Sequence, residues 1–191
     1  MNDQVQAELK KIFNGRFSTS GSTRTNYARG EDTYDPILSK AVVFPETNQE
    51  VSQILRLCNE HKIPVVPFGT GTSLEGNVVG NEKGITISLE KMNKILSVNA
   101  EDFDCRVQAC VTKEQLNEYL REDGVFFPID PGANAAIGGM ASTSASGTMA
   151  VKYGTMKTVI TGLTVVLPNG DIINTGGRTK KTSAGYNLTN L

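Results

Sequence analysis

The sequence contains no tryptophan, a single histidine and only three cysteines among its 191 residues. With His61 as the one imidazole, histidine-based metal clusters are excluded, and a Ser-His-Asp triad would have to use that residue. We expect His61 to be a half-exposed residue at the end of a helix. Cys58, Cys105 and Cys110 are odd in number and lack CxxC spacing, which favours reduced thiols in a cytosolic setting over a disulfide framework or a zinc site.

An excess of charge of one sign and long apolar runs are also missing. Lys and Arg number 19 against 20 Asp and Glu, so a duplex nucleic-acid binder, which needs surplus cations to neutralise phosphates, is not expected. No apolar run approaches the roughly 20 residues of a membrane-spanning helix. Residues 1–11 have neither the apolar core of a secretory signal nor the arginine content of a transit peptide. The composition is that of a globular protein.

The apolar pattern indicates helices and strands in alternation. Residues 2–13 have helical periodicity with Ile12 on the buried face, whereas residues 14–35 have none and are expected to form a loop or an extended arm. Capping boxes that begin at Thr47 and at Thr112 open two further helices. The segments expected to form strands are 41–44, 63–67, 84–89, 95–98, 104–111, 163–167 and 171–174.

The order of these segments predicts the fold class. Strand 41–44, the helix after Thr47 and strand 63–67 form a βαβ unit, and hence a parallel pair of strands. The helix after Thr112 is expected to bury Tyr119, and Asn169-Gly170 predicts a hairpin turn. We therefore expect an α+β protein, with a βαβ-containing lobe up to about residue 90 and an antiparallel lobe after it.

Glycine is abundant, and 16 of the 19 glycines lie from Gly69 onward. The segment PVVPFGTGTSLEG follows a predicted strand but matches no standard phosphate loop. A Walker loop needs lysine where Asn77 stands, and the dinucleotide pattern GxGxxG needs glycine where Leu74 stands. What remains is a strand end, two glycines and the hydroxyls of Thr72 and Ser73. This pattern predicts that backbone N–H groups bind an anion without lysine, and the alternative is a plain tight loop.

A second segment, DPGANAAIGGMASTSASGTMAVKYG, consists almost entirely of small residues. Such a surface has little side chain and many short donors, which favours a flat aromatic ligand with phosphates laid against the backbone. Small residues also permit close helix packing, which is the alternative explanation. Two such segments about sixty residues apart predict one long ligand, and a dinucleotide fits better than a mononucleotide.

These motifs together resemble a known family. The pairing of PFGTGTSLEG with DPGxxxxIGGxxxxxxSGTxxxxYGTMK, followed by LTVVLPNGDII and KKTSAGYNL, is similar to the FAD-binding domain of the vanillyl-alcohol oxidase and p-cresol methylhydroxylase superfamily. Within it, the sequence is most similar to the respiratory D-lactate dehydrogenases and the glycolate oxidase flavin subunit. The resemblance covers residues from about Pro36 to Leu191, and the tract STSASGT favours D-lactate.

The resemblance implies a set of FAD-binding residues. The pyrophosphate loop would be Phe68, Gly69, Thr70, Gly71, Thr72 and Ser73. Further contacts would come from Pro131, Ile137, Gly138, Gly139, Ser142, Thr143, Ser144, Gly147, Tyr153 and Gly154, with Ile160 near the adenine. Some superfamily members attach FAD through a histidine in these loops, and because none is present here we expect noncovalent FAD.

The resemblance also implies a division of the chain. Residues 1–35 would be an N-terminal helix and arm, and residues 36–191 would be a p-cresol methylhydroxylase-type FAD-binding domain. Its two α+β lobes would meet near residue 90, the second lobe being incomplete at the C-terminus. The family's substrate-binding cap domain would be absent. We therefore expect a truncated protein that has no catalytic residues of its own, binds no metal and turns over little or no D-lactate.

For the full-length protein the resemblance implies oxidation of a D-2-hydroxy acid, D-lactate or glycolate, to the 2-oxo acid, with hydride transfer to flavin N5. Electrons would pass to a quinone, a cytochrome or a partner flavoprotein, and the protein would be cytoplasmic or peripheral at the inner membrane. Two alternatives stay open. One is a non-catalytic nucleotide- or anion-binding module, and the other is a different FAD-linked oxidase, such as a sugar-acid oxidase.

Overall fold

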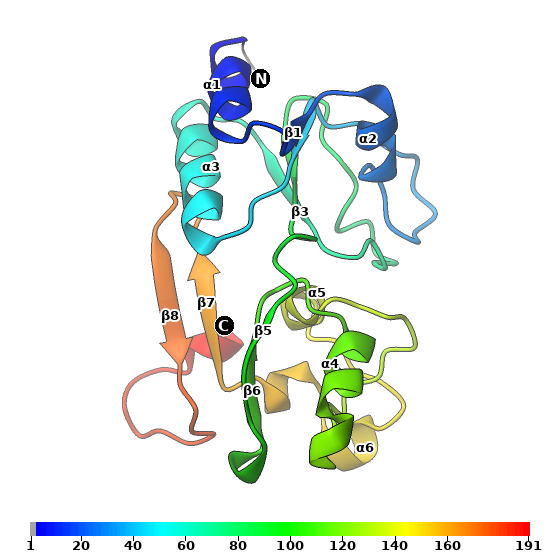
Figure 1. Cartoon of the computed structure of the whole chain (residues 1–191), viewed down its shortest axis with the longest axis vertical. Coiled ribbons are helices and arrows are strands. Elements are labelled where there is room, and N and C mark those ends of the chain that lie inside the picture. Colours follow the sequence, from blue (N-terminus) through cyan, green and yellow to red (C-terminus); the bar gives the residue numbers. More distant parts are fainter. Residues whose placement is uncertain (1–2) are drawn as a thin grey trace. The chain divides into compact units, whose positions relative to one another are not determined.

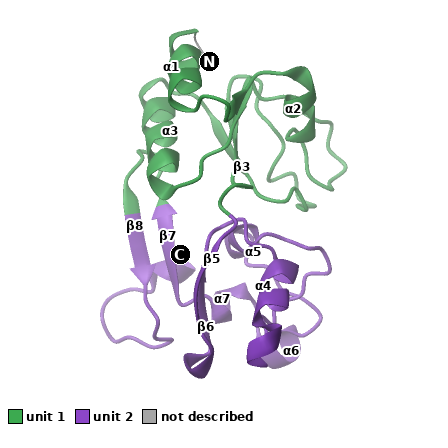
Figure 2. Ribbon diagram, in the orientation of Figure 1, with its two compact units in different colours: residues 1–92, 166–172 green, residues 93–165, 173–191 purple. Residues whose placement is uncertain are grey.

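A computed structural model of the chain describes residues 3–191 (Figure 1). The chain divides into two compact units, shown in Figure 2. Residues 1–92 with 166–172 form unit 1, and residues 93–165 with 173–191 form unit 2. Each unit combines helices with strands, so the expected α+β class is confirmed. No helix in the described part of the chain is long and apolar enough to cross a membrane.

Unit 1 is built on a sheet of four strands. Its helices are α1 Asp3–Ile12, α2 Gly21–Asn26 and α3 Asn48–Glu60, and its strands are β1 Phe17–Ser18, β2 Ala41–Val43, β3 Val65–Phe68 and β4 Ile85–Ser88. The strand order is β1-β2-β4-β3. Strands β2 and β3 both run parallel to β4, and β1 is antiparallel to β2.

The βαβ unit is present, but its two strands do not pair with each other as the sequence predicted. Strand β4 lies between them, with Ile85 level with both Ala41 and Val65. Every residue of β4 is buried, which suits it to the centre of the sheet. Its polar Thr86 is accommodated there because the hydroxyl donates to Ser39 Oγ at 2.8 Å. A crossover through α3 can pass over one strand position, so the parallel arrangement is kept.

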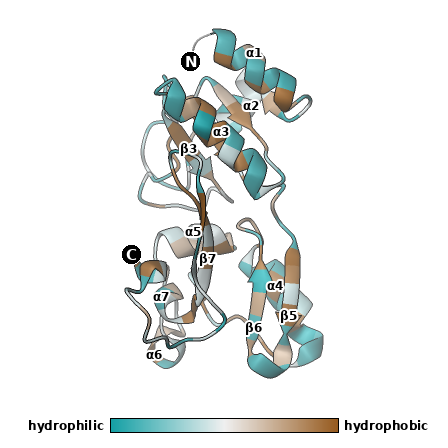
Figure 3. Ribbon diagram, turned by 90° about the vertical axis from the view of Figure 1, so that its left-hand side faces the viewer, coloured by the Kyte–Doolittle hydropathy of each residue, from teal (hydrophilic) through white to brown (hydrophobic). Residues whose placement is uncertain are grey.

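The core of unit 1 lies between α1, α3 and the sheet. Leu9 and Phe13 are fully buried and pack with Ile54 of α3. Figure 3 shows polar and apolar residues on different faces of these helices. The side of α1 that carries Leu9 and Phe13 faces the core. Ile12 lies at the edge of this side and is 43% exposed, so the expected burial of Ile12 was wrong. The expected start of this helix, Asn2, lies outside the described residues.

The arm of residues 14–35 was expected to lack regular elements, but it contains β1 and α2. Helix α2 buries no residue, so no apolar periodicity marks it in the sequence. The hydroxyl of Ser20 instead accepts a hydrogen bond from Thr23 N at 3.2 Å, and Thr25 Oγ1 donates to Gly21 O at 2.9 Å. Side-chain hydroxyls therefore stabilise a helix that a search for apolar patterns does not find.

The start of α3 is held by the polar contacts that the capping box predicted. Thr47 Oγ1 accepts from Glu50 N at 3.2 Å, and the Glu50 carboxylate accepts from Glu46 N at 2.6 Å. Arg16 donates to both carboxylate oxygens of Glu50, each at 2.6 Å. The Arg16 hydrogen bonds are the main cause that holds the pKa of Glu50 below its ordinary value, while burial acts in the opposite direction.

Replacing Glu50 by glutamine is expected to lower the free energy of unfolding by about 1.5–3 kcal/mol at neutral pH, the range for hydrogen bonds to charged groups. Because the folded-state pKa of Glu50 is depressed, its contribution is complete above the unfolded value of about 4.3 and is lost as the pH falls through the folded value. Urea denaturation measures the free energy of unfolding of both proteins. The difference between Glu50→Gln and the unaltered chain is expected to become smaller as the pH is lowered. Glu60→Gln, at the exposed end of the same helix, is the control. A difference that does not change with pH would contradict this account.

Unit 2 combines short helices with two two-stranded sheets. Its α-helices are α4 Lys113–Leu120, α5 Ile137–Ser142, α6 Ala150–Tyr153 and α7 Met156–Val159, with 3₁₀ turns at Ala100–Asp102, Arg121–Asp123 and Leu188–Asn190. Its strands are β5 Ile95–Asn99 and β6 Asp104–Val107, together with most of β7 Gly162–Val166 and β8 Ile172–Gly176. Strands β5 and β6 are antiparallel, and β7 pairs with β8.

Helix α4 begins after Thr112, whose hydroxyl accepts from Gln115 N at 3.2 Å. The Gln115 side chain donates to Asn93 O at 2.9 Å instead of returning to the cap, so the predicted capping box is closed on one side only. Leu116 is buried, but Tyr119, three residues later, is 58% exposed. The expected burial of Tyr119 was wrong because the buried row of α4 follows the i, i+4 spacing from Leu116.

The hairpin predicted after β7 is confirmed. Gly170 N donates to Leu167 O at 2.8 Å, and residues 168–170 form the loop, with Gly170 at φ 85°. The end of the hairpin, Val166–Ile172, belongs to unit 1. There the buried hydroxyl of Ser52 donates a hydrogen bond to the Gly170 carbonyl.

Candidate cofactor-binding site

The first predicted segment lies in unit 1, directly after β3. Phe68 ends this strand, and its carbonyl accepts from Leu89 N at 2.9 Å. Residues 69–77, here named the 69–77 loop, form no helix or strand. Walker and dinucleotide loops lead into a helix whose N-terminus faces the phosphates. The absence of a helix from residues 69–77 agrees with the mismatches at Leu74 and Asn77.

Five consecutive backbone donors in this loop have no protein acceptor. Among the hydrogen bonds of residues 3–191, none is donated by the N–H groups of residues 69–73. The Thr70 and Thr72 hydroxyls lie 3.3 Å apart, and Ser73 Oγ donates to Asn77 Oδ1 at 2.7 Å. The only charged residue in the loop is Glu75, which is exposed. An anion bound here would be held by neutral donors.

Gly71 has a conformation that only glycine adopts without strain. Its φ is +75°, and a Cβ added there would lie 2.7 Å from Cζ of Phe68. The Phe68 ring is 6% exposed and meets the edge of Tyr27 at a centroid distance of 5.0 Å. The loop backbone therefore passes directly over a buried aromatic ring that cannot move aside.

The second predicted segment lies in unit 2, where most of its backbone is already hydrogen-bonded. Ile137 N donates to Val111 O, and Gly138 N donates to Ala109 O, both at 2.8 Å. A Cβ on Gly138 would lie 2.8 Å from the Ala109 Cβ, and one on Gly147 would lie 1.9 Å from Asp130 O. At these two glycines the small size serves close packing within the unit, which was the alternative explanation.

Asp130 anchors this packing. Its carboxylate accepts from Lys113 Nζ at 2.8 Å and from Gly132 N at 3.4 Å, and its carbonyl accepts from Thr148 N at 3.3 Å. The Lys113 hydrogen bond is the main cause that holds the pKa of Asp130 below its ordinary value. The segment is therefore tied to the start of α4 by an ionised carboxylate.

Other predicted residues of unit 2 keep accessible polar groups. Gly139 has open space around it, and its N–H donates to no acceptor among the described residues. The hydroxyls of Ser142 and Thr143 donate to carbonyls one helical turn earlier, at 2.9 and 3.1 Å, which leaves their oxygens free to accept. Ser144 has the left-handed φ of 49°. Pro131 is exposed, while Tyr153, Gly154 and Ile160 are half-buried.

The Tyr153 ring contacts its neighbours in unit 2. It meets the ring of Phe126 edge to face at 5.5 Å between centroids, and Lys152 Nζ lies 4.9 Å from its centroid. These contacts fix the orientation of the ring on the surface of α6. Tyr153 is therefore an ordered side chain.

The three thiols and the imidazole of the chain lie outside these segments. No disulfide joins the three cysteines, and burial raises the pKa of Cys58 to about 11. His61 is the half-exposed C-cap of α3, as expected. Within residues 3–191 no group of three or more His, Cys, Asp or Glu side chains is placed to hold a metal ion.

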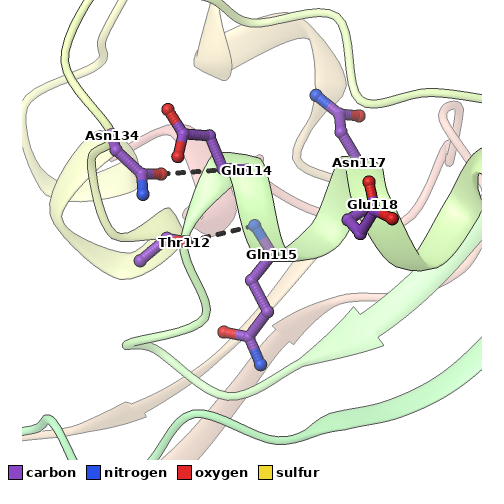
Figure 4. A pocket seen from close by; sticks show the side chains of 6 residues that line it. All are labelled: Thr112, Glu114, Gln115, Asn117, Glu118 and Asn134. Atoms are coloured by element: carbon purple, nitrogen blue, oxygen red, sulfur yellow. Dashed lines mark hydrogen bonds between the residues drawn. The ribbon is translucent and has the colours of Figure 1, made fainter.

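A pocket beside α4 contains none of the predicted residues (Figure 4). Its lining side chains are engaged in holding the start of the helix, as Thr112 and Asn134 accept from the amides of Gln115 and Glu114. Asn117 makes two hydrogen bonds with the backbone of Phe127. The hydrogen bonds of Thr112, Asn117 and Asn134 thus serve local structure. The residues that line it are Thr112, Glu114, Gln115, Asn117, Glu118 and Asn134.

Sequence reasoning missed one set of residues at the 69–77 loop. Gly30, Glu31 and Tyr34 of the arm contact this loop, although about forty residues separate them in the chain. Such contacts have no periodic pattern. The nearest signal is Asp32 in the stretch RGEDTYD, because Asp commonly accepts from backbone amides in tight turns.

The chain thus has a strand end followed by a glycine-containing loop, in which the amides of residues 69–73 are unbonded within the described part of the chain and no side chain is cationic. An α+β domain with such a loop is suited to the phosphates of a nucleotide cofactor. The chemistry of this donor set fits a pyrophosphate. The family described as "FAD binding domain" matches residues 39–176. This chain belongs to that family, and its cofactor is FAD.

Two curated relatives illustrate the similarity. The chain is 41% identical over 190 residues to the mitochondrial D-lactate dehydrogenase (cytochrome) of Arabidopsis thaliana, covering 98% of this chain and 34% of that protein. It is 36% identical over 177 residues to the glycolate oxidase subunit GlcD of Bacillus subtilis, covering 92% and 38%. The chain spans about a third of the length of the curated relatives it matches.

The fold is also found among solved structures. The structure of p-cresol methylhydroxylase with substrate bound matches with a TM-score of 0.78 at 24% identity, covering 91% of this chain and 35% of that chain. The expected p-cresol methylhydroxylase-type fold is therefore confirmed.

Proposed function

We propose that residues 69–73 bind the pyrophosphate of FAD through their backbone N–H groups. The observation that carries this proposal is the run of five amides without a protein acceptor, next to the threonine hydroxyls. Two phosphate charges need many donors, and neutral donors supply them without a lysine. The ring of Phe68 would support the loop by packing against its backbone at Gly71.

We infer that the predicted segment of unit 2 supplies further FAD contacts. Gly139, Ser142, Thr143 and Ser144 are exposed, which suits their polar groups to direct contact. Gly138 and Gly147 would act indirectly, by allowing the segment to pack closely. Pro131, Ile137, Tyr153, Gly154 and Ile160 remain part of the proposed site on the resemblance to the family.

We propose that the whole protein oxidises a D-2-hydroxy acid, D-lactate or glycolate. The names of the relatives support this substrate class. FAD, when bound, supplies the two-electron acceptor: hydride leaves C2 of the acid for flavin N5, and a base takes the hydroxyl proton. We assign no catalytic base to residues 3–191. This chain contributes binding and orientation of the cofactor.

The electron acceptor is proposed as a quinone, a cytochrome or a partner flavoprotein. Support comes from the Arabidopsis relative, whose name specifies cytochrome. An acceptor held at a membrane would place the whole protein at the membrane surface, which is the basis for proposing a peripheral location.

Purified chain is expected to bind one FAD and to release it on acid denaturation. The reason is that His61, the only histidine, lies in unit 1 at the end of α3 and outside the proposed loops, so no imidazole is available there for attachment. A fluorescence titration with FAD measures binding, and the absence of tryptophan removes indole emission from the signal. Flavin that remains with the acid precipitate would refute noncovalent binding. A chain that takes up no FAD would refute the proposed function.

A further inference from the structure

The arm of unit 1 is hydrogen-bonded to the 69–77 loop and to the residues that follow it. Glu31 N donates to Ser73 O at 3.0 Å, and Gly80 N donates to Ala28 O at 3.0 Å. The first bond lies in the middle of the loop, and the second lies just beyond its end. No residue of this arm lies within the part of the chain that matches the family, residues 39–176.

The contact between arm and loop is close enough to exclude a methyl group. A Cβ on Gly30 would lie 2.5 Å from Ser73 O and 3.1 Å from Gly71 O. At the other end of the arm segment, a Cβ on Gly76 would lie 2.8 Å from the ring of Tyr34. The arm therefore contacts the loop at Gly71, Ser73 and Gly76.

Asp32 sets the shape of the arm between these two contacts. One carboxylate oxygen accepts from Gly30 N at 3.1 Å, and the other accepts from Tyr34 N at 3.0 Å. Asp32 is half-buried, whereas Asp35 in the same arm is exposed. Both oxygens of Asp32 are thus used to hold the residues that touch the loop.

The contact with the arm also affects the direction of backbone N–H groups in the loop. In a trans peptide the C=O of one residue and the N–H of the next point in opposite directions. With the carbonyls of Gly71 and Ser73 facing the arm, the N–H groups of Thr72 and Leu74 are directed away from it. The amides of residues 69–73 donate no hydrogen bond to the described residues, and within the loop the Ser73 hydroxyl is hydrogen-bonded to Glu75 N and to Asn77 Oδ1. The contacts with the arm therefore add order to residues 71–73.

We propose that Gly30–Tyr34, named the arm clip, holds the 69–77 loop in its FAD-binding form, with Asp32 as the positioning residue. The proposal rests on the proposed function of the loop. Without the clip the loop populates other conformations, and FAD associates only with the fraction that is correctly formed. The dissociation rate of bound FAD depends on the contacts in the complex, and the clip does not touch those contacts directly.

Stopped-flow measurement of FAD binding to the 191-residue chain tests the clip. Asp32→Ala and Gly30→Ala are expected to reduce the association rate constant about tenfold and to leave the dissociation rate constant unchanged. Asp35→Ala removes the same charge from the same arm, and Gly21→Ala adds a methyl group where no atom lies within 4 Å. Both controls are expected to match the unaltered chain. If the two clip variants bound FAD at the same association rate as the unaltered chain and the two controls, the proposal would be overturned.

Limited proteolysis of the FAD-free proteins gives a readout that does not need the cofactor. Thermolysin cleaves before leucine, and Leu74 in the loop is 67% exposed. Cleavage at Leu74 is expected to be about tenfold faster in the two clip variants, at melting temperatures close to those of the controls. Unchanged cleavage would show that the arm does not order the loop.

The two failures are distinguishable. If the unaltered chain takes up no FAD, the proposed function fails, and the cleavage rates alone decide whether the arm orders the loop. If the chain binds FAD but the clip variants bind at the same rates, only the clip fails. Should Asp32→Ala not fold, as judged by circular dichroism, Gly30→Ala decides the outcome, because it keeps the Asp32 carboxylate and both of its backbone donors in the chain.

Discussion

Replacing Gly71 by alanine is expected to weaken FAD binding about thirtyfold to a hundredfold while the chain stays folded. The residue has a φ of +75°, which costs a non-glycine residue about 1–3 kcal/mol. The added Cβ would also lie 2.7 Å from Cζ of Phe68. Relief requires the loop to lift from the ring, because the ring is buried and held by Tyr27. Lifting the loop displaces the amides proposed to bind the pyrophosphate.

An FAD titration of Gly71→Ala measures this effect, and Gly124→Ala is its matched control. Gly124 has a φ of +68° with no atom within 4 Å of an added Cβ, so its substitution carries the backbone strain without the clash. Gly124 also lies in the other unit, outside both predicted segments. The control is expected to bind FAD normally. Equal affinity in Gly71→Ala and the unaltered chain would contradict a role of this loop in binding.

Replacing Gly147 by alanine is expected to destabilise unit 2 by about 3 kcal/mol, whether or not FAD is present. The new methyl group would lie 1.9 Å from Asp130 O and 2.2 Å from its carbonyl carbon, and both are backbone atoms. Backbone cannot give way as a flexible side chain can. The Asp130 carbonyl also accepts from Thr148 N, so moving it breaks a hydrogen bond.

Urea denaturation followed by circular dichroism measures this loss, with Gly139→Ala as the comparison. Gly139 lies in the same small-residue segment with nothing within 4 Å of an added Cβ, so its substitution is expected to change stability by about 0.5 kcal/mol at most. Its exposed position predicts an effect on FAD binding instead. If Gly147→Ala were as stable as the unaltered chain and lost only FAD, the glycine would serve the cofactor and not the packing.

The local elements of this protein follow from its sequence. The caps at Thr47 and Thr112 and the turn at Asn169-Gly170 depend on side chains a few residues apart, and each was predicted. The family resemblance likewise rests on short motifs whose spacing is visible in the chain, and it predicted FAD and the fold.

Features that depend on distant partners could not be predicted. Strand β4 lies between β2 and β3 although it follows both in the chain, and no pairing rule for a βαβ unit reveals this position. The close packing at Gly138 and Gly147 could not be predicted because their partners, Ala109 and Asp130, are identified only once the chain is folded. The contact of the arm with the 69–77 loop is made mainly by backbone atoms, and backbone contacts have no residue signature.

The hairpin end Val166–Ile172 determines when unit 1 becomes complete during translation. Unit 1 includes Val166–Ile172, and the Ser52 hydroxyl in α3 has its acceptor at Gly170. When residue 92 has been added to the nascent chain, all four strands of the unit 1 sheet have been synthesised, but the acceptor at Gly170 has not. At about 5–20 residues per second, roughly 4–16 seconds pass before residue 172 is added. During that interval the nascent chain lacks the last segment of unit 1, so unit 1 is completed only after residues 93–165 of unit 2 have been translated.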